Sequence, residues 1–254
     1  MATRLRLDQL VVDRGLASAR ERARALILAG QVLVDGAPVT KAGTAVDADA
    51  QIELLAPDHP YVGRGGVKLA HALDAFRIDV SGREALDIGA STGGFTDVML
   101  QRGARRVVAL DVGHGQLDWG LRNDPRVIVV EHFNARHLTV TALPGPVDVV
   151  TIDVSFISLR KILPVLPPLL RPGADVIALV KPQFEAGRSE VKKGIVRDPA
   201  IHARVLDDVS RSAAAVGLTA VGSIPSPITG QKGNVEFLLH LRPEVGLQPD
   251  TTEE

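Results

Sequence analysis

Residues Ala85–Asp111 read ALDIGASTGGFTDVMLQRGARRVVALD, and this stretch decides the fold. Its first apolar run ends in a glycine-rich turn, a helical pattern follows from Phe95 to Arg102, and a second apolar run, Val107 to Leu110, ends on an acid. This order predicts a strand, a tight turn, a helix and a second strand. Glycines let the backbone approach a ligand closely, and the start of a helix offers unbonded N–H groups.

The spacing of the turn distinguishes between ligand classes. Asp111 lies 22 residues after Gly89, close to the offset of about 20 at which a strand-end carboxylate meets a ribose hydroxyl. The glycines follow G-x-x-x-G-G rather than the G-x-G-x-x-G that wraps a pyrophosphate. Asp87 precedes the first glycine by two residues, where a carboxylate suits a cationic ligand better than a diphosphate. S-adenosylmethionine fits these features, and a ligand-free turn is the alternative.

Composition excludes several kinds of site. The chain has 254 residues, of which 45% are hydrophobic, so a sizeable core is available. It has no cysteine, which excludes disulfides, thiolate metal ligands and a cysteine nucleophile, and no metal site is predicted. The formal net charge of −1 predicts neither nucleic-acid nor membrane affinity by itself. No signal-like segment or apolar run of about 18 residues is present, so we expect a cytoplasmic protein without membrane association.

Residues 1–59 are predicted to form a separate small α+β module. Two short helical patterns precede a strand at Val32–Val34, a turn at Asp35-Gly36 and a strand at Gln51–Leu55. Arginines are concentrated within its first 24 residues, at Arg4, Arg6, Arg14, Arg20, Arg22 and Arg24. Such a cluster predicts an RNA-binding surface, and a solvated helix face is the alternative.

The rest of the chain is predicted to be one larger domain. Residues 60–63 form a hinge in which Tyr61 and Val62 pack between the domains, unless the hinge is an inert linker. The larger domain spans 64–243, and 244–254 form a disordered tail.

Seven strands alternate with helices in the larger domain until the last two, which a loop joins. The alternation predicts an α/β fold with a doubly wound parallel sheet, in which the last strand lies antiparallel beside the sixth. Ile157–Leu170 is predicted to be a proline-interrupted helix, and Gly187–Asp198 a mobile basic loop. Ligands of such sheets bind at the carboxyl ends of the strands. The candidates there are Asp87, Asp111, Asn134, Asp153 and Lys181.

Two resemblances cover nearly the whole chain. The stretch Arg6–Val39, with the Gly30–Gly36 pattern GQVLVDG, resembles the RNA-binding module first seen in the fourth small-subunit ribosomal protein. The motifs of the larger domain resemble those of the TlyA (hemolysin) family, whose second domain is an FtsJ-like ribose 2′-O-methyltransferase. These motifs are RGGVKL from Arg64, LDIGASTGGFTD, DVGHGQL from Asp111, LRNDPRV from Leu121, IDVSFIS from Ile152, VKPQFE from Val180 and GNVEF from Gly233.

The resemblance implies a seven-stranded Rossmann-like class I methyltransferase that acts on ribosomal RNA or ribosomal subunits, on a cytidine ribose, with no obligate protein partner evident. It implies a catalytic Lys-Asp-Lys-Glu tetrad, here Lys68, Asp153, Lys181 and Glu236. The predicted S-adenosylmethionine site comprises Asp87, Gly89, Ala90, Ser91, Thr92, Gly93, Gly94, Asp111, Val112, Asn134, Ala135 and Asp153. Arg64 joins the six N-terminal arginines as a predicted RNA-binding residue.

The tetrad suits attack by a ribose hydroxyl, which must lose a proton as it attacks the sulfonium methyl. Lys181 either takes that proton as a neutral amine or stays charged and stabilises the developing alkoxide. Three other functions remain open: a base N-methyltransferase, a non-catalytic RNA-binding or assembly factor, and a membrane-lytic protein. The sequence disfavours the first, because the Asp153–Phe156 turn lacks the two prolines of such enzymes, and the last, because no segment could span a membrane.

Overall fold

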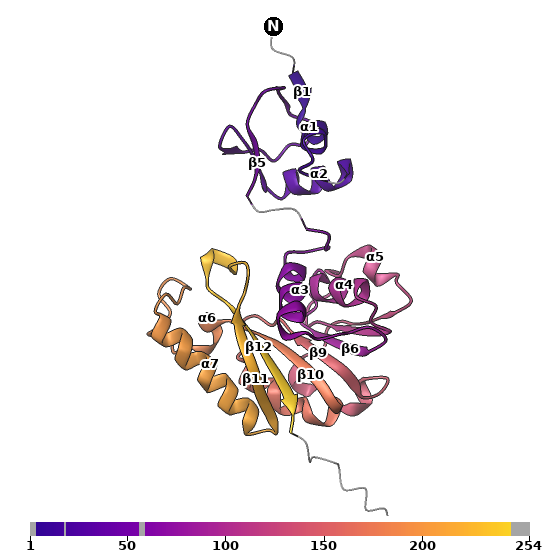
Figure 1. Ribbon diagram of the computed structural model, residues 1–254, viewed down its shortest axis with the longest axis vertical. Helices are drawn as coiled ribbons and strands as arrows, with labels where there is room; N and C mark the ends of the chain where they lie inside the picture. The colour runs from indigo at the N-terminus through magenta and orange to yellow at the C-terminus, as the bar shows by residue number, and fades with distance from the viewer. Residues whose placement is uncertain (1–3, 18, 56–58, 245–254) are drawn as a thin grey trace, which may run out of the picture. The chain divides into compact units, whose positions relative to one another are not determined.

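The computed structural model describes residues 4–17, 19–55 and 59–244, and the chain divides into two compact units, residues 1–60 and 61–254 (Figure 1). Tyr61 and Val62 pack against the core of the second unit, and the Val62 N–H donates to Asp97 Oδ2 at 2.9 Å. The predicted disordered tail lies outside the described residues except for Glu244, whose N–H donates to the Gly217 carbonyl at 3.0 Å.

The first unit is a small α+β fold. Its elements are β1 (Arg4–Arg6), α1 (Leu7–Asp13), α2 (Arg20–Leu28), β2 (Val32–Val34), β3 (Ala37–Pro38), β4 (Ala45–Asp47) and β5 (Ile52–Leu54). β3, β2 and β5 form one antiparallel sheet, and β1 pairs with β4 in a second sheet that the sequence did not predict. The core consists of apolar residues at helical spacing, with Leu7 and Val11 of α1 packed against Ala23 and Ile27 of α2.

The second unit contains a seven-stranded sheet in the order β11-β12-β10-β9-β6-β7-β8. The strands are β6 (Glu84–Ile88), β7 (Arg106–Leu110), β8 (Val127–Val130), β9 (Val147–Ile152), β10 (Leu170–Val180), β11 (Leu218–Pro225) and β12 (Phe237–Pro243). β12 runs antiparallel to both of its neighbours, whereas the other pairs are parallel. The predicted insertion of the last strand beside the sixth is confirmed.

Helices and short 3₁₀ turns cover both faces of this sheet. They are α3 (Gly65–Phe76), α4 (Gly94–Gln101), α5 (Trp119–Arg122), α6 (Pro182–Glu185), α7 (Pro199–Ala214), η1 (Ala135–His137), η2 (Val140–Ala142), η3 (Leu159–Lys161), η4 (Leu163–Val165), η5 (Pro167–Leu169) and η6 (Gln231–Gly233). Because strand side chains alternate, Leu86 and Ile88 join the core under α7, while Ala85 joins the core under α3 and α4.

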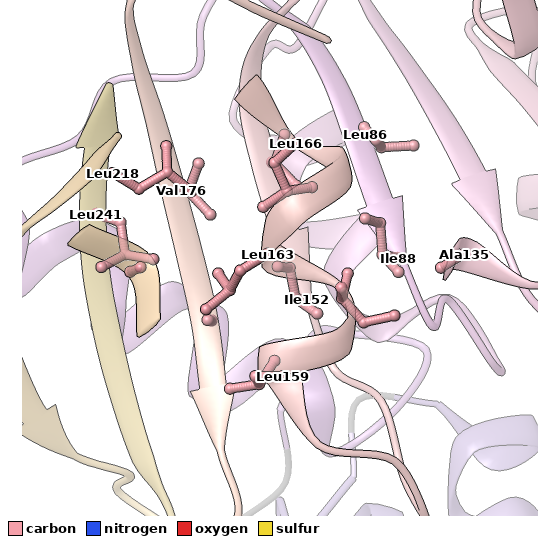
Figure 2. Packing of buried hydrophobic residues seen from close by; sticks show 14 of the residues in the cluster. Leu86, Ile88, Ala135, Ile152, Leu159, Leu163, Leu166, Val176, Leu218 and Leu241 are labelled. Atoms are coloured by element: carbon pink, nitrogen blue, oxygen red, sulfur yellow. The ribbon is translucent and has the colours of Figure 1, made fainter. Parts of the chain in front are cut away.

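The segment predicted as one proline-interrupted helix is instead a chain of 3₁₀ turns, η3 to η5. Prolines at positions 164, 167 and 168 supply no N–H for a continuous helical ladder. The segment still covers the sheet, because Leu159, Leu163 and Leu166 belong to the same buried cluster as Ile88, Ile152 and Val176 of the strands (Figure 2). Each such fully buried leucine contributes roughly 1.5–3 kcal/mol of hydrophobic free energy. Strand β10 begins directly after this segment, at Leu170, and its register with β9 shifts between Leu170 and Asp175.

Candidate active site

Two adjoining cavities open beyond the carboxyl ends of β6, β7 and β9. The larger, of about 450 Å³, is lined by side chains that include Asp111, Phe133 and Val154. The smaller, of about 310 Å³, is lined by α3, the glycine turn and the β11–β12 connection. Gly89, Ser91 and Asp153 border both cavities, so the two are parts of one continuous site. This is the edge of the sheet at which the sequence predicts a ligand.

Asp111 organises the glycine turn through backbone donors. Its Oδ2 accepts from the Ser91 N–H at 2.8 Å, and its Oδ1 accepts from the Gly113 N–H at 2.7 Å. Each carboxylate oxygen keeps a second lone pair for another donor. Because Asp111 also borders the larger cavity, it is placed to accept hydrogen bonds from a ribose diol.

Two glycines of the turn are required by close packing. Gly89 has a φ of +86°, and a Cβ there would lie 2.4 Å from the Asp153 carbonyl oxygen. A Cβ at Gly94 would lie 2.9 Å from the Gly66 nitrogen. The first contact joins the ends of β6 and β9, and the second lets α3 approach α4. Together they bring Lys68 of α3 to the wall of the smaller cavity.

Asp87 lines neither cavity, unlike Asp111 and Asp153, the other acids predicted for the cofactor site. It is fully buried, and it accepts from the Thr96 hydroxyl at 2.7 Å and from the Thr151 hydroxyl at 2.9 Å. Burial raises the pKa of Asp87 to about 6. Its side chain ties α4 and β9 to β6, because the alternation of the strand turns it away from the open edge. Asp87 therefore positions the turn.

The other predicted cofactor residues divide into two groups. Residues at the wall of one or both cavities are Gly89, Ala90, Ser91, Thr92, Gly94, Asp111, Val112, Asn134, Ala135 and Asp153. Gly93 is absent from both walls, and a Cβ there would lie 2.3 Å from Leu121 Cδ1. Gly93 thus permits the packing of α5 against the turn.

Lys68 and Glu236 form a buried ion pair. The Lys68 Nζ lies 2.5 Å from Glu236 Oε2, and the two side chains are 10% and 3% exposed. Lys68 comes from the first turns of α3, and Glu236 precedes β12, 168 positions later in the chain. A Cβ at Gly230 would lie 2.0 Å from Glu236 Oε1, so the connection before β12 closes directly over this carboxylate.

Lys181 and Asp153 form a second ion pair, in which the carboxylate is more exposed to solvent. The Lys181 Nζ lies 2.5 Å from Asp153 Oδ1 without the alignment of a hydrogen bond, and it donates to Ser155 Oγ at 3.0 Å. The Asp153 side chain is 23% exposed and borders both cavities. The four residues of the predicted tetrad thus occur as two lysine–carboxylate pairs around one site.

Several site residues were not assigned from the sequence. Ser155 holds Lys181, Gln116 borders the larger cavity, and Phe156 borders it with a 91% exposed side chain. Phe156 also lies 5.1 Å from Phe184 between ring centroids. Both are visible in the sequence, Phe156 as the aromatic residue of the motif IDVSF and Gln116 within the motif DVGHGQL that begins at Asp111.

The predicted RNA-binding arginines of the first unit all have partners within it. Arg6, Arg20 and Arg24 converge on Asp8, at 2.8, 3.1 and 3.1 Å from its Oδ2. We call these three arginines and Asp8 the arginine cluster. The Asp8 side chain is fully buried, while the arginine side chains stay 42–50% exposed. Hydrogen bonding from Arg6 holds the pKa of Asp8 well below its usual range.

The remaining predicted arginines are anchored individually. Arg4 pairs with Asp47, Arg14 donates to the carbonyls of residues 48 and 50, and Arg22 donates to the carbonyl of residue 59. Arg64 belongs to the second unit, where it borders the smaller cavity and donates to the Thr229 carbonyl at 3.2 Å.

Comparisons with known proteins identify the family. The chain is 51% identical over 244 residues to the 16S/23S rRNA (cytidine-2′-O)-methyltransferase TlyA of Mycobacterium tuberculosis, covering 95% of this chain and 91% of that protein. The chain belongs to the TlyA family of FtsJ-like methyltransferases. The FtsJ-like methyltransferase model matches residues 61–243, and the S4 domain model matches residues 5–52.

Other TlyA-family proteins carry the hemolysin name. Hemolysin A of Brachyspira hyodysenteriae is 42% identical over 238 residues, which are 93% of this chain and 99% of that protein. The solved structure of a hemolysin-named protein from Streptococcus thermophilus is 44% identical, with a TM-score of 0.77 over 99% of this chain and 92% of that one. The predicted class I methyltransferase fold with its N-terminal RNA-binding domain is confirmed.

No helix within 4–17, 19–55 and 59–244 is long and apolar enough to cross a membrane. In the same part of the chain, no group of three or more His, Cys, Asp or Glu side chains is arranged to hold a metal ion.

Proposed function

We propose that this protein transfers the methyl group of S-adenosylmethionine to the 2′-hydroxyl of a cytidine in ribosomal RNA. One observation carries the proposal: two lysine–carboxylate pairs flank a cavity that continues into a pocket bordered by the Asp111 carboxylate. The 51% identity to an rRNA (cytidine-2′-O)-methyltransferase supports the same activity and the same class of substrate.

The larger cavity suits the adenosine part of the cofactor. Its wall combines the Asp111 carboxylate with the apolar side chains of Leu110, Phe133 and Val154. A carboxylate orients a ribose diol, and the apolar wall accommodates an adenine ring. The methionine part would extend past Gly89 and Ser91, which border both cavities. Bound S-adenosylmethionine would supply the electrophilic methyl group at the junction.

A lysine can accept the proton of the attacking hydroxyl or stabilise the negative charge that develops on its oxygen. As the 2′-oxygen forms its bond to the methyl carbon, the carbon–sulfur bond breaks and the hydroxyl proton leaves. Lys181 either receives that proton or stabilises the oxygen as it becomes negative. Asp153 and Ser155 fix the Lys181 Nζ in place, so alignment costs little at the moment of reaction.

Lys68 is placed to act as a second cation at the smaller cavity. It borders this cavity, and the buried Glu236 carboxylate holds its Nζ. A fixed ammonium near the attacking oxygen favours the alkoxide-like transition state over the neutral hydroxyl. We therefore assign Lys68 to electrostatic stabilisation and Glu236 to its orientation.

The first unit would bring ribosomal RNA to this site. Three guanidinium groups share the single Asp8 carboxylate, so the arginine cluster keeps excess positive charge on a surface that remains half exposed. Phosphates attract such a surface without regard to sequence, and the folded shape of the ribosomal RNA then presents the target ribose.

The decisive test is methyl transfer from labelled cofactor to purified small and large ribosomal subunits, assayed separately. We expect label in at least one RNA, at a position that resists alkaline cleavage of the following phosphodiester. Nucleoside analysis should identify 2′-O-methylcytidine. A methylated base would instead indicate an N-methyltransferase, and binding to subunits without transfer would indicate an assembly factor.

A further inference from the structure

The basic segment 187–198, predicted to be a mobile loop, contains a hairpin turn. The backbones of Lys192 and Ile195 exchange two hydrogen bonds of 3.0 Å, which close a two-residue hairpin. Its central residues, Lys193 and Gly194, have φ angles of +54° and +80°. This is the pattern of a type I′ turn, which normally selects Asn or Gly at its first position. A lysine in the left-handed region is strained, because its Cβ crowds the following carbonyl oxygen.

A second Lys-Gly pair with similar positive φ angles lies in the β11–β12 connection. Lys232 and Gly233 have φ angles of +59° and +80°. The Gly230 N–H donates to the Asn234 carbonyl at 2.8 Å, and the Gly233 N–H donates to the Gly230 carbonyl at 3.1 Å. We call Lys193-Gly194 and Lys232-Gly233 the lysine turns.

Asn234 joins the two lysine turns. Its side chain is 3% exposed, its Nδ2 donates to the Gly194 carbonyl at 2.9 Å, and its Oδ1 accepts from the Val196 N–H at 3.3 Å. A Cβ atom built on Gly194 would lie only 3.6 Å from the Lys232 Nζ. The ammonium of one lysine turn therefore rests against the backbone of the other.

The lysine turns concentrate positive charge without a compensating acid. Lys192, Lys193 and Lys232 are exposed, and within the described residues none of them has a carboxylate at ion-pair distance. Like charges held on adjacent turns repel each other, so this arrangement is less favourable alone than with an anion between the turns. Strained backbone that is locked by a buried side chain is typical of ligand-binding sites.

The lysine turns adjoin the candidate active site. Ile228, Thr229 and Gly230 border the smaller cavity, and Glu236 follows Asn234 by two residues. A polynucleotide whose ribose entered this cavity would pass its backbone along the β11–β12 connection. Lysine binds phosphate as a point charge with three rotatable donors, which suits a backbone contact that is independent of base identity.

We propose that Lys193 and Lys232 clamp an RNA phosphate next to the ribose that is methylated, with Asn234 as the residue that positions both turns. This inference rests on the proposed rRNA methyltransferase function. The clamp provides affinity for the RNA backbone, whereas the lysine–carboxylate pairs provide the chemistry.

The test compares Lys193→Gln, Lys232→Gln and the double variant with the wild-type protein. Arg77→Gln is the matched control, because Arg77 is an exposed cation at the opposite end of α3 from Lys68 and has the same left-handed φ, +55°. Filter binding to purified ribosomal subunits is measured over a series of salt concentrations. Losing the contact with this one phosphate should reduce the salt slope by about 0.7, and should raise KM for subunits about tenfold while kcat changes less than about twofold.

The two proposals fail in different ways. A double variant whose salt slope and KM match those of Arg77→Gln would overturn the clamp, whether or not methyl is transferred. Wild-type protein that binds subunits but transfers no methyl would overturn the proposed function, while the binding slope still decides the clamp. A fall in kcat with an unchanged slope would also overturn the clamp, because the lysines would then act on the chemistry.

The positioning role of Asn234 is tested by a double-mutant cycle. Asn234→Ala should raise KM for subunits several-fold in the wild-type background and leave calorimetric affinity for S-adenosylmethionine unchanged. In the Lys193→Gln/Lys232→Gln background the same change should add little, because the groups that it positions are gone. Equal effects in the two backgrounds would show that Asn234 acts independently of the lysine turns.

Discussion

The arginine cluster and the lysine–carboxylate pairs of the active site hold their charges in different proportions. Three guanidinium groups share one buried carboxylate in the cluster, whereas each tetrad lysine has a carboxylate of its own. The cluster therefore keeps a surplus of positive charge, whereas the lysines and carboxylates of the site balance each other. A balanced site can move a proton and a methyl group without leaving an uncompensated charge in a partly dry cavity.

The two pairs of the site also differ from each other. Glu236 is almost completely buried, whereas Asp153 is 23% exposed at the junction of the cavities. Removing the lysine should therefore have different consequences at the two positions. At Asp153 water can solvate the remaining carboxylate, but at Glu236 it cannot.

The largest expected effect is that of Lys181→Ala on methyl transfer. We expect turnover to fall at least about 1,000-fold, equivalent to about 4 kcal/mol, because the hydroxyl loses the group that takes its proton or stabilises its charge. Affinity for S-adenosylmethionine should change less than about twofold by calorimetry. Lys161→Ala, an exposed lysine outside both cavities, is the control. Unchanged turnover would remove Lys181 from the catalytic residues.

Lys68→Ala should have the larger effect on stability. It leaves the buried Glu236 carboxylate without a partner, and we expect a loss of about 3 kcal/mol in the free energy of unfolding, measured by urea titration. Lys181→Ala should lose clearly less free energy of unfolding, because the Asp153 carboxylate that it leaves behind is partly exposed. The double change Lys68→Met and Glu236→Gln should restore much of the loss. If Lys68→Ala and Lys181→Ala lose the same free energy of unfolding, the proposed difference between the two ion pairs is wrong.

Asp111→Ala should weaken cofactor binding about tenfold, or about 1.4 kcal/mol. Asp111 differs from the other acids because its partners are backbone N–H groups rather than cations. Calorimetry with S-adenosylmethionine measures the effect, and Asp79→Ala, an exposed acid outside both cavities, is the control. An undiminished affinity would remove Asp111 from the cofactor site.

The smallest effect is expected for Asp8→Asn in the arginine cluster. The free energy of unfolding should fall by roughly 1 kcal/mol at pH 7, because the arginines remain half exposed and recover their hydration. The depressed pKa of Asp8 gives the sign: its contribution is complete above the ordinary pKa of 3.8 and is lost as pH falls through the folded value. Guanidinium unfolding should therefore separate wild type from variant at pH 7 and less so towards pH 3. A difference that grows on acidification would contradict this assignment.

Local patterns in the sequence were sufficient for much of the fold. The apolar runs of β6 and β7, the Gly89–Gly94 turn and the terminal acid Asp111 all lie within the single stretch Glu84–Asp111. Even the antiparallel last strand followed from the short connection before it. The segment from Ile157 to Leu170 was harder, because the same apolar spacing serves a helix or a chain of 3₁₀ turns, and only its prolines argue for the turns.

The sequence by itself determined that a glycine turn, a strand-end acid and a set of lysines and carboxylates belong to one methyltransferase domain. Tertiary structure alone decided which charges meet: Glu236 with Lys68 across 168 positions, Lys181 with Asp153 and Ser155, and three arginines with Asp8. It also turned Asp87 inward and joined the lysine turns through Asn234. Such partnerships depend on the direction of side chains from separate elements, which is fixed only when those elements pack together.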